Sequence, residues 1–426
     1  MPPAPPAPPA PPAPPAPPAP AAAPPPDADP ARWRALLLLA LAELLGMSLW
    51  LAGSAVAPQY QALWALTPSQ TGWLTTSVQL GFVAGTALSA LLNLADVVPA
   101  RRLFAASAAA GALANAPLLA LPAEPGRAYP LALACRFATG AALAGVYPPA
   151  MKMVATWFRA RRGLAVGTVV GALTVGKATP YLVHAIPGAG IAPVVLVTSG
   201  AALLAALLVG TGYREGPFAF PARPFSWALV GGIVRERRWR LATGGYLGHM
   251  AELYSFWTWI PAFVAASLAA AGRTDARAAS AASLLAFAII ALGGVGCVWG
   301  GLVADRVGRE PLVVWAMAAS GACALLVGFT FGRPLWLFAP VALAWGFFVI
   351  ADSAQFSVLV AESVPPHAVG TALTLQTSLG FLLTTLTIQL VPPLVARLGW
   401  AWAFPVLALG PAAGIWSIRR LAAARG

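Results

Sequence analysis

The strongest constraint on this chain is a series of apolar runs, each of about twenty residues, that recurs along its length. A helix of about twenty residues crosses a hydrocarbon core of about 30 Å, and it satisfies its own backbone hydrogen bonds there. The runs predict twelve membrane-spanning helices, at residues 34–57, 70–93, 103–121, 128–154, 164–186, 190–212, 240–268, 280–303, 312–331, 334–360, 369–392 and 397–418.

The composition excludes a soluble globular body. Hydrophobic residues make up 59% of the 426 residues and charged residues only 9%. That is too little polar surface to cover a water-soluble core of this size. We therefore expect an all-α membrane protein.

The sequence is internally duplicated. Glu43 lies in Leu-Ala-Glu-Leu-Leu and Glu252 lies in Met-Ala-Glu-Leu-Tyr, and in each case a Trp follows seven residues later. The same offset of 209 residues relates Asp96 to Asp305. Two landmarks in one register predict two pseudo-symmetric six-helix bundles, an arrangement typical of transporters whose repeats move about a site at their interface.

The duplication and the polar stretches set the expected domain boundaries. The first 26 residues repeat Pro-Pro-Ala, which favours a solvated polyproline II chain without a core. This tract lacks the basic start and apolar helix of a signal peptide. We expect a disordered, Pro/Ala-rich cytoplasmic tail at 1–30, bundles at 31–212 and 240–420, a cytoplasmic linker at 213–239, and a short cytoplasmic tail at 421–426.

The positive charges predict the orientation. If both termini are cytoplasmic, 19 of the 26 Lys and Arg residues lie on that side, 5 lie on the other, and Arg136 and Lys177 fall within spans. Lys and Arg near span ends are retained in the cytoplasm. The net charge of +13 is thus a topology signal that requires no nucleic-acid partner. We expect a multi-pass protein of the cell (inner) membrane.

The sequence offers no catalytic or metal-binding pattern. The three cysteines, Cys135, Cys297 and Cys323, fall within predicted spans and lack metal-ligand spacing. No Ser/His/Asp grouping or phosphate-binding glycine loop stands out. We therefore expect no disulfide, no metal, no cofactor and no enzymatic activity.

Three short motifs lie in the loops and in the fourth span. The sequence from Gly301 to Arg309, Gly-Leu-Val-Ala-Asp-Arg-Val-Gly-Arg, resembles the loop signature of the major facilitator superfamily, and the loop around Asp96 is a degenerate copy of it. Arg136 and Gly140 resemble the Arg-x-x-x-Gly motif of span 4. The segment from Trp157 to Gly167 resembles the nitrate/nitrite, cyanate and oxalate/formate branches. The resemblance implies a twelve-helix transporter that alternates access.

The loop charges are candidates for a gate latch. Asp305 can neutralise a neighbouring helix end, while Arg306 and Arg309 reach the facing bundle in one of the two access states. Ordinary positive-inside charge together with a helix-breaking Gly308 would explain the arginines but not Asp305 and Asp96. The candidate gating residues are Asp96, Arg101, Arg102, Asp305, Arg306, Gly308 and Arg309.

The most informative residues are charges that cannot reach an interface. Burying one such charge alone costs about 2.5–3.5 kcal/mol on insertion scales, so each needs a partner or a function. One alternative is that the acids pair with the cations merely to join helices. We expect instead that they face a central cavity; the five are Glu43, Arg136, Lys177, Glu252 and Asp352.

Chemistry suggests a role for each of these groups. A carboxylate in an apolar cavity can titrate near neutral pH and carry a proton, as Glu43, Glu252 or Asp352 could. The planar guanidinium of Arg136 suits a carboxylate- or nitrate-like anion or a permanent partner carboxylate. Lys177 is the candidate for binding a substrate anion or for exchanging charge with an acid.

Neighbouring residues add further candidates. His249 lies three residues before Glu252, on the same side of the predicted helix, and is either a proton relay or an ordinary hydrogen-bonded histidine. Tyr254 and Trp257 are the aromatic residues nearest to Glu252, which favours them as cavity-lining residues.

The sequence therefore predicts a secondary transporter that moves a small organic or inorganic anion, by proton coupling or by anion exchange, and that works as a monomer in the bilayer. The first alternative is a proton-driven exporter of drugs or metabolites, because Arg-x-x-x-Gly also occurs in antiporter branches. A transport-inactive membrane sensor is the remote alternative, since the chain retains its intramembrane charges.

Overall fold

The computed structural model describes residues 29–218 and 225–424, apart from the side chains of Ala95 and Asp96. The predicted tail at 1–30 lies almost entirely outside the described residues. Within the described ranges the regular structure consists of α-helices and short 3-10 helices. This architecture confirms the prediction of an all-α protein.

The first half supplies the helices of six spans. In chain order these are α1 (Ala31–Met47), α2 (Ala52–Ala55), α3 (Ala57–Trp64), α4 (Pro68–Leu91), α5 (Leu94–Val97), α6 (Ala100–Asn115), η2 (Ala116–Ala120), α7 (Pro125–Leu143), α8 (Tyr147–Ala155), α9 (Arg162–His184) and α10 (Ile191–Gly212).

The second half repeats this pattern. Its helices are α11 (Trp227–Arg235), α12 (Arg237–Ala270), α13 (Ala276–Val307), α14 (Arg309–Leu326), η3 (Val327–Thr330), α15 (Leu335–Phe348), α16 (Ser353–Ala361), η4 (Pro366–Ala368), α17 (Val369–Leu398), α18 (Trp400–Ala403), η5 (Phe404–Ala408) and α19 (Leu409–Ala423). Helix α11 lies within the predicted linker, and α19 extends past residue 420.

Eleven helices of the described part are long and apolar enough to cross a membrane. The one expected span that is not among these eleven is the first, which the sequence predicts as one helix over 34–57. In the structure α1 ends at Met47, a turn follows, and the chain continues in α2 and α3. The expectation of a continuous first helix is therefore wrong, although the twelve-helix arrangement holds.

Two more spans are interrupted near their middles. The fourth span breaks between α7 and α8, where Pro148 and Pro149 occupy the first turn of the new helix. Proline lacks an amide donor and cannot continue a preceding helix without a clash. The tenth span breaks between α15 and α16, and Asp352 is the residue that precedes α16. Breaks inside a membrane leave backbone groups that need other partners.

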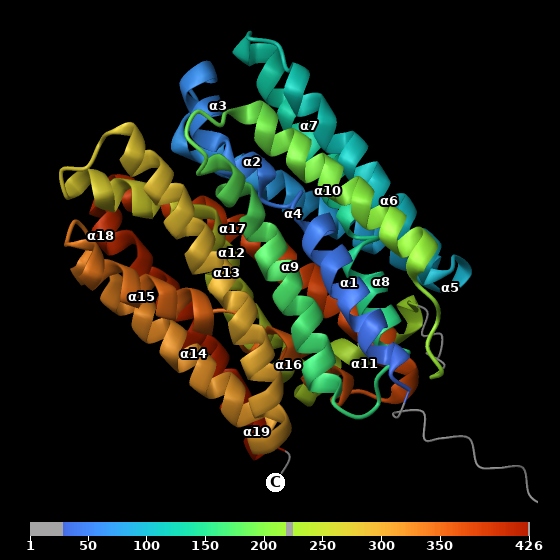
Figure 1. Ribbon diagram of the computed structural model, residues 1–426. Helices are drawn as coiled ribbons and strands as arrows, with labels where there is room; N and C mark the ends of the chain where they lie inside the picture. The colour runs from blue at the N-terminus through green and yellow to red at the C-terminus, as the bar shows by residue number, and fades with distance from the viewer. Residues whose placement is uncertain (1–28, 219–224, 425–426) are drawn as a thin grey trace, which may run out of the picture.

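The two halves lie side by side, with both ends of the described chain at one end of the molecule, which we call the terminal end. Figure 1 shows the blue-to-green helices of the first half grouped on one side and the yellow-to-red helices of the second half on the other. Helices α9 and α13 run beside each other at the border (Figure 1). A second contact joins α4 to α17.

Glycines set the close approach of α9 and α13. A Cβ atom added at Gly171 would lie 2.6 Å from the carbonyl oxygen of Gly294, and one added at Gly167 would lie 2.7 Å from that of Cys297. Near the terminal end, a Cβ at Gly301 would lie 2.5 Å from the Gly163 oxygen. Backbone therefore packs directly on backbone across the two halves, which only small residues permit.

We expect Gly171→Ala to destabilise this conformation, because the added methyl group forces α9 and α13 apart. The cost of such overpacking is about 1–3 kcal/mol, which should lower the midpoint of thermal unfolding of the purified protein in detergent. Gly200→Ala is the matched control, since no atom lies within 4 Å of its added Cβ. A Gly171→Ala protein that unfolds at or above the wild-type midpoint would contradict this packing.

Candidate functional site

Lys177 lies in an aromatic cage at the centre of the molecule. Its Nζ donates to the hydroxyl of Tyr254 at 2.6 Å. The same nitrogen lies 3.9 Å from the ring centroid of Trp50 and 4.8 Å from those of Tyr254 and Trp257. Ammonium groups are attracted to the faces of aromatic rings, most strongly where water is excluded. We call Lys177 with Trp50, Tyr254 and Trp257 the Lys177 cage.

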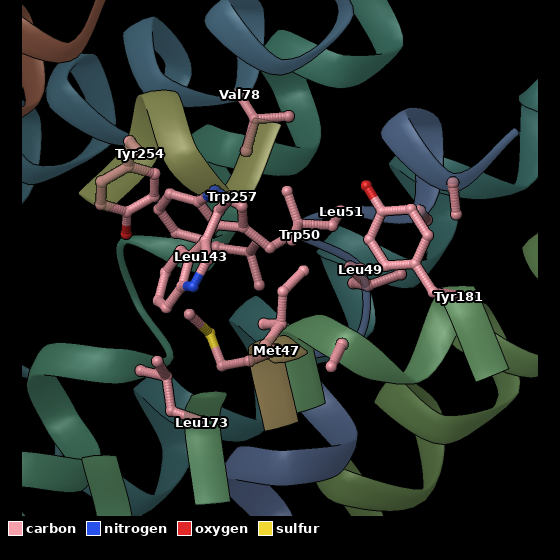
Figure 2. Close-up of a cluster of buried hydrophobic side chains, with 14 of the residues drawn as sticks. Met47, Leu49, Trp50, Leu51, Val78, Leu143, Leu173, Tyr181, Tyr254 and Trp257 are labelled. Carbon is pink, nitrogen blue, oxygen red and sulfur yellow. The ribbon is translucent and has the colours of Figure 1, made fainter. Parts of the chain in front are cut away.

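The cage is built from both halves of the molecule. Lys177 on α9 and Trp50 after α1 come from the first half, whereas Tyr254 and Trp257 come from α12 in the second half. Trp50, Tyr254 and Trp257 point toward one another in Figure 2. The four side chains are at most 4% exposed. The site therefore depends on how the halves sit against each other.

Polar contacts join the halves at the end of the molecule opposite the termini. Ser69 donates to the side-chain oxygen of Gln389 at 2.8 Å, and the amide nitrogen of Gln389 donates to Thr76 at 3.2 Å. His184 Nδ1 lies 2.8 Å from the hydroxyl of Ser283. These contacts link α4 to α17 and α9 to α13. With the cage itself buried, this conformation keeps Lys177 away from solvent.

Glu43 is buried on α1 without a hydrogen-bond donor. The residue is fully buried, and both carboxylate oxygens lack a partner among the described residues. Lys177 is the cation whose field acts on it. Helices α1 and α9 approach so closely that a Cβ at Gly176 would lie 2.2 Å from the carbonyl oxygen of Leu44. Glu43 is thus a buried acid next to the cage, and its carboxylate oxygens accept no hydrogen bond from the described residues.

Arg136 donates hydrogen bonds to the backbone at the break in the first span. Its Nη1 donates to the carbonyl of Leu49 at 3.0 Å and to the side chain of Asn115 at 3.2 Å, and its Nη2 donates to the carbonyl of Trp50. The residue is fully buried. In the described part of the chain it has no carboxylate partner. An anion or a carboxylate was the expected partner; in the structure Nη1 and Nη2 donate to backbone carbonyls and to Asn115, whereas Nε is buried without a partner.

Glu252, the repeat partner of Glu43, has a different environment. It accepts from the hydroxyl of Ser320 at 2.9 Å and from the indole nitrogen of Trp345 at 2.8 Å. These donors come from α14 and α15, so Glu252 faces its own bundle. Trp345 lies 209 residues after Arg136, the offset of the duplication. The fourth and the tenth spans therefore each place a hydrogen-bond donor against the first span of their own half.

His249 and Asp352 form a second buried pair. Their Nδ1 and Oδ1 atoms lie 2.9 Å apart, and both side chains are at most 2% exposed. The pair connects α12 to the break in the tenth span. From the sequence, His249 was either a proton relay on the Glu252 side of the helix or an ordinary hydrogen-bonded histidine; in the structure it lies against Asp352. The described residues contain no group of three or more potential metal ligands.

Tyr254 and Trp257 line the site, but not beside Glu252 as the sequence suggested. Positions 252 and 254 lie on different faces of α12, because successive helical residues are separated by about 100°. Glu252 faces its own bundle, while Tyr254 and Trp257 face Lys177 across the border. Trp50, the Trp that follows Glu43 by seven residues, lies in the turn after α1 and completes the cage.

Several polar side chains near the break in the first span, between α1 and α2, are not among the candidate site residues named from the sequence. The hydroxyls of Ser54 and Thr75 are hydrogen-bonded to each other. The hydroxyl of Tyr181, one turn after Lys177, and the amide of Gln79 have no hydrogen-bond partner although they are buried. Buried polar atoms without partners are rare and require an explanation such as a ligand or water. No sequence motif marks these residues as a group.

The candidate gating residues make different contacts in this structure. The carboxylate of Asp305 lies against the start of α9, so that a Cβ at Gly163 would be 2.6 Å from its Oδ1. Arg309 was expected to reach the facing bundle, but it pairs with Glu362 of its own half at 2.9 Å. Gly308 separates α13 from α14 with a φ of 93°, which favours glycine.

The remaining candidate gating residues differ in how far they are exposed to solvent. Arg306 is exposed. Arg101 is partly buried and Arg102 exposed, both in the first turn of α6. Asp96 lies in α5, and its side chain is outside the described part of the structure. Among the described loop side chains, Asp305 lies against the other half in this conformation.

The arrangement is suited to binding rather than to covalent chemistry. It offers one cation in an aromatic cage, one unpaired acid nearby, and hydroxyl and amide groups that lack partners. The cation is the only group of the cage with a full charge. A ligand that replaces the Tyr254 hydroxyl at Nζ would be held between the two halves.

Comparison with known proteins agrees with the fold. Residues 38–388 match the sequence pattern of the Major Facilitator Superfamily. Among solved structures 306 chains match. One of them is the crystal structure of a D-xylose-proton symporter, which is similar with a TM-score of 0.67 and 16% sequence identity over 91% of this chain and 96% of that chain. No curated protein sequence matches this chain.

We expect Arg136→Gln to lower stability, because the carbonyls of Leu49 and Trp50 would lose a buried charged donor. Leaving such groups unsatisfied costs about 1–3 kcal/mol each. Adding Glu43→Gln or Glu252→Gln should not restore the thermal midpoint, since neither acid is the partner of Arg136. Recovery of the wild-type midpoint in either double variant would mean that Arg136 serves a buried ion pair instead.

Proposed function

Because this chain belongs to the Major Facilitator Superfamily, whose members are membrane transporters and not enzymes, we propose that it carries a small anion across the membrane by proton symport. The family supports transport by alternating access. The Lys177 cage supports a negatively charged substrate. Glu43 supports coupling of substrate transport to a proton.

The observation that carries the proposal is the unpaired ammonium of Lys177. A buried cation that only stabilised the fold would be expected to pair with a carboxylate, because desolvating a charge costs several kcal/mol. Lys177 instead donates to a neutral hydroxyl and lies against three rings. In a low-dielectric site one free positive charge attracts an anion strongly. The cage thus favours a small anion over a neutral or cationic substrate.

Glu43 provides the coupling by competing for the same cation. An ionised carboxylate without a donor would be costly at this depth, so Glu43 carries a proton in the closed conformation. When it loses that proton, its negative charge competes with the substrate for Lys177. Substrate binding and protonation of Glu43 therefore favour each other, and the anion and the proton travel together.

The second half supplies positioning groups. Hydrogen bonds from Ser320 and Trp345 to Glu252 fix α12 against α14 and α15. The His249–Asp352 contact fixes α12 to the tenth span. Both contacts set the position of Tyr254 and Trp257 and hence the shape of the cage. Arg136 does the same for Trp50 in the first half.

We further propose that the protein lies in the cell (inner) membrane with both termini in the cytoplasm and works as a monomer. The distribution of Lys and Arg supports this orientation. Asp305 then lies at the cytoplasmic end, where its contact with α9 is one that relative motion of the halves would break. Asp305 is thus the proposed latch.

The alternatives predict different ligands. The symporter with a similar fold is titled for D-xylose and protons, but at 16% identity that likeness supports the fold alone. A neutral sugar would have no need of the Lys177 charge. An exporter of drugs or metabolites would bind neutral or cationic compounds in an aromatic site.

Replacement of the cation tests the substrate class. With labelled nitrate, formate and oxalate as anionic probes and D-xylose as the neutral probe, the wild type in proteoliposomes should take up at least one anion. Lys177→Gln should weaken binding of that anion at least tenfold, or about 1.4 kcal/mol. Lys177→Arg should retain part of the binding, because it keeps the charge.

The matched control is Arg397→Gln, which removes an exposed cation at the end of α17 and should leave uptake unchanged. If the purified protein binds D-xylose or cationic drugs and ignores every anion of the panel, the anion assignment is wrong and the exporter takes its place.

The pH dependence tests the role of Glu43. As pH rises, Glu43 loses its proton and competes for Lys177, so the affinity of the wild type for the anion should fall. Glu43→Gln mimics the protonated acid and should bind the anion with an affinity that no longer depends on pH. It should exchange anions but fail to accumulate them along a proton gradient. Accumulation by Glu43→Gln at the wild-type rate would remove Glu43 from the coupling and leave anion exchange or another acid.

A further inference from the structure

A hollow at the terminal end of the second half is lined by two arginines that the transport site does not use. It has a volume of about 250 Å³ and lies between the start of α12 and the end of α19. Its lining consists of Arg237, Arg420, Ala423 and Ala424. Two small residues leave room between the guanidinium groups. The hollow therefore combines space with concentrated positive charge.

The arginines of this hollow have no acidic partner in the described part of the chain. Within the described residues neither Arg237 nor Arg420 forms an ion pair with a carboxylate. The nearest acid in sequence, Glu236, directs its carboxylate to the backbone amide of Arg238. Arg238 in turn donates to the carbonyl of Ala424 at 3.2 Å and so joins the two helix ends.

Two features place this hollow at the level of lipid headgroups. The guanidinium carbon of Arg420 lies 4.7 Å from the ring centroid of Trp416, and Trp416 is 57% exposed. Tryptophan in such a position marks the boundary between hydrocarbon and headgroups. The adjoining α11 exposes Trp227 and Val234 and ends at Arg235. An exposed apolar surface beside arginines is typical of a helix that lies in the membrane interface.

We propose that the hollow binds the phosphodiester headgroup of an anionic phospholipid, with Arg237 and Arg420 on either side of the phosphate. Arginine forms planar, charge-assisted hydrogen bonds to phosphate oxygens, and the hollow offers two guanidinium groups at the depth where phospholipid headgroups lie. The bound lipid joins the first turn of α12 to the last turn of α19. Because α12 carries Tyr254 and Trp257, the lipid holds the helix that forms the second-half wall of the cage.

Native mass spectrometry of the purified protein tests this site, with phosphatidylglycerol as the anionic probe and phosphatidylcholine as the zwitterionic one. The wild type should retain phosphatidylglycerol preferentially. Arg237→Gln combined with Arg420→Gln should weaken its retention at least about tenfold, since each arginine near a lipid surface contributes on the order of 1 kcal/mol. If the double variant does not fold, each single variant should still show a several-fold loss.

The matched control is Arg235→Gln with Arg240→Gln, which removes the same charge at the same end but does not line the hollow. This pair should lose much less phosphatidylglycerol than the Arg237 and Arg420 variants, because its arginines do not line the hollow. An equal loss in both pairs would reduce the effect to diffuse positive charge and overturn the site, as would wild-type retention by the Arg237 and Arg420 variants. Displacement of the lipid by millimolar inorganic phosphate would show a phosphate site and overturn the lipid assignment.

Discussion

The structure depends on keeping one positive charge in the middle of a membrane protein without a fixed counter-ion. Lys177 is 2% exposed, and burial of its charge is stabilised by a hydroxyl and three aromatic rings. Trp50 comes from the first half of the chain, and Tyr254 and Trp257 come from α12 in the second half. The charge is therefore stable only when the first span, α9 and α12 are correctly arranged.

The break in the first span shows how fold and site are connected. Trp50 can reach Lys177 because α1 ends at Met47, and the chain can break there because Arg136 satisfies the carbonyls of Leu49 and Trp50. On the other side, Glu252 fixes α12 through Ser320 and Trp345. The glycines of α9 and α13 then bring the two halves close enough to close the cage.

The spans and the duplication were predictable because hydrophobic length and repeated sequence are local signals. Lys177, Glu43, Tyr254 and Trp257 could be singled out from the sequence because charges and aromatic residues inside spans are few; the structure buries all four, and their role in transport stays a prediction. The break after Met47 was not predictable, because tertiary contacts with Arg136 determine where that helix ends. For the same reason the contacts of Arg136, His249 and Arg309 could not be predicted from the sequence: they depend on packing between spans that are far apart in sequence.

The central claim is that a substrate anion and the charge of Glu43 compete for Lys177. Its most direct test is to count the protons taken up when purified protein in a weakly buffered detergent solution binds its anion, at a pH where wild-type affinity is already falling. The account predicts uptake approaching one proton for each anion bound. Anion binding without proton uptake at every pH would contradict it.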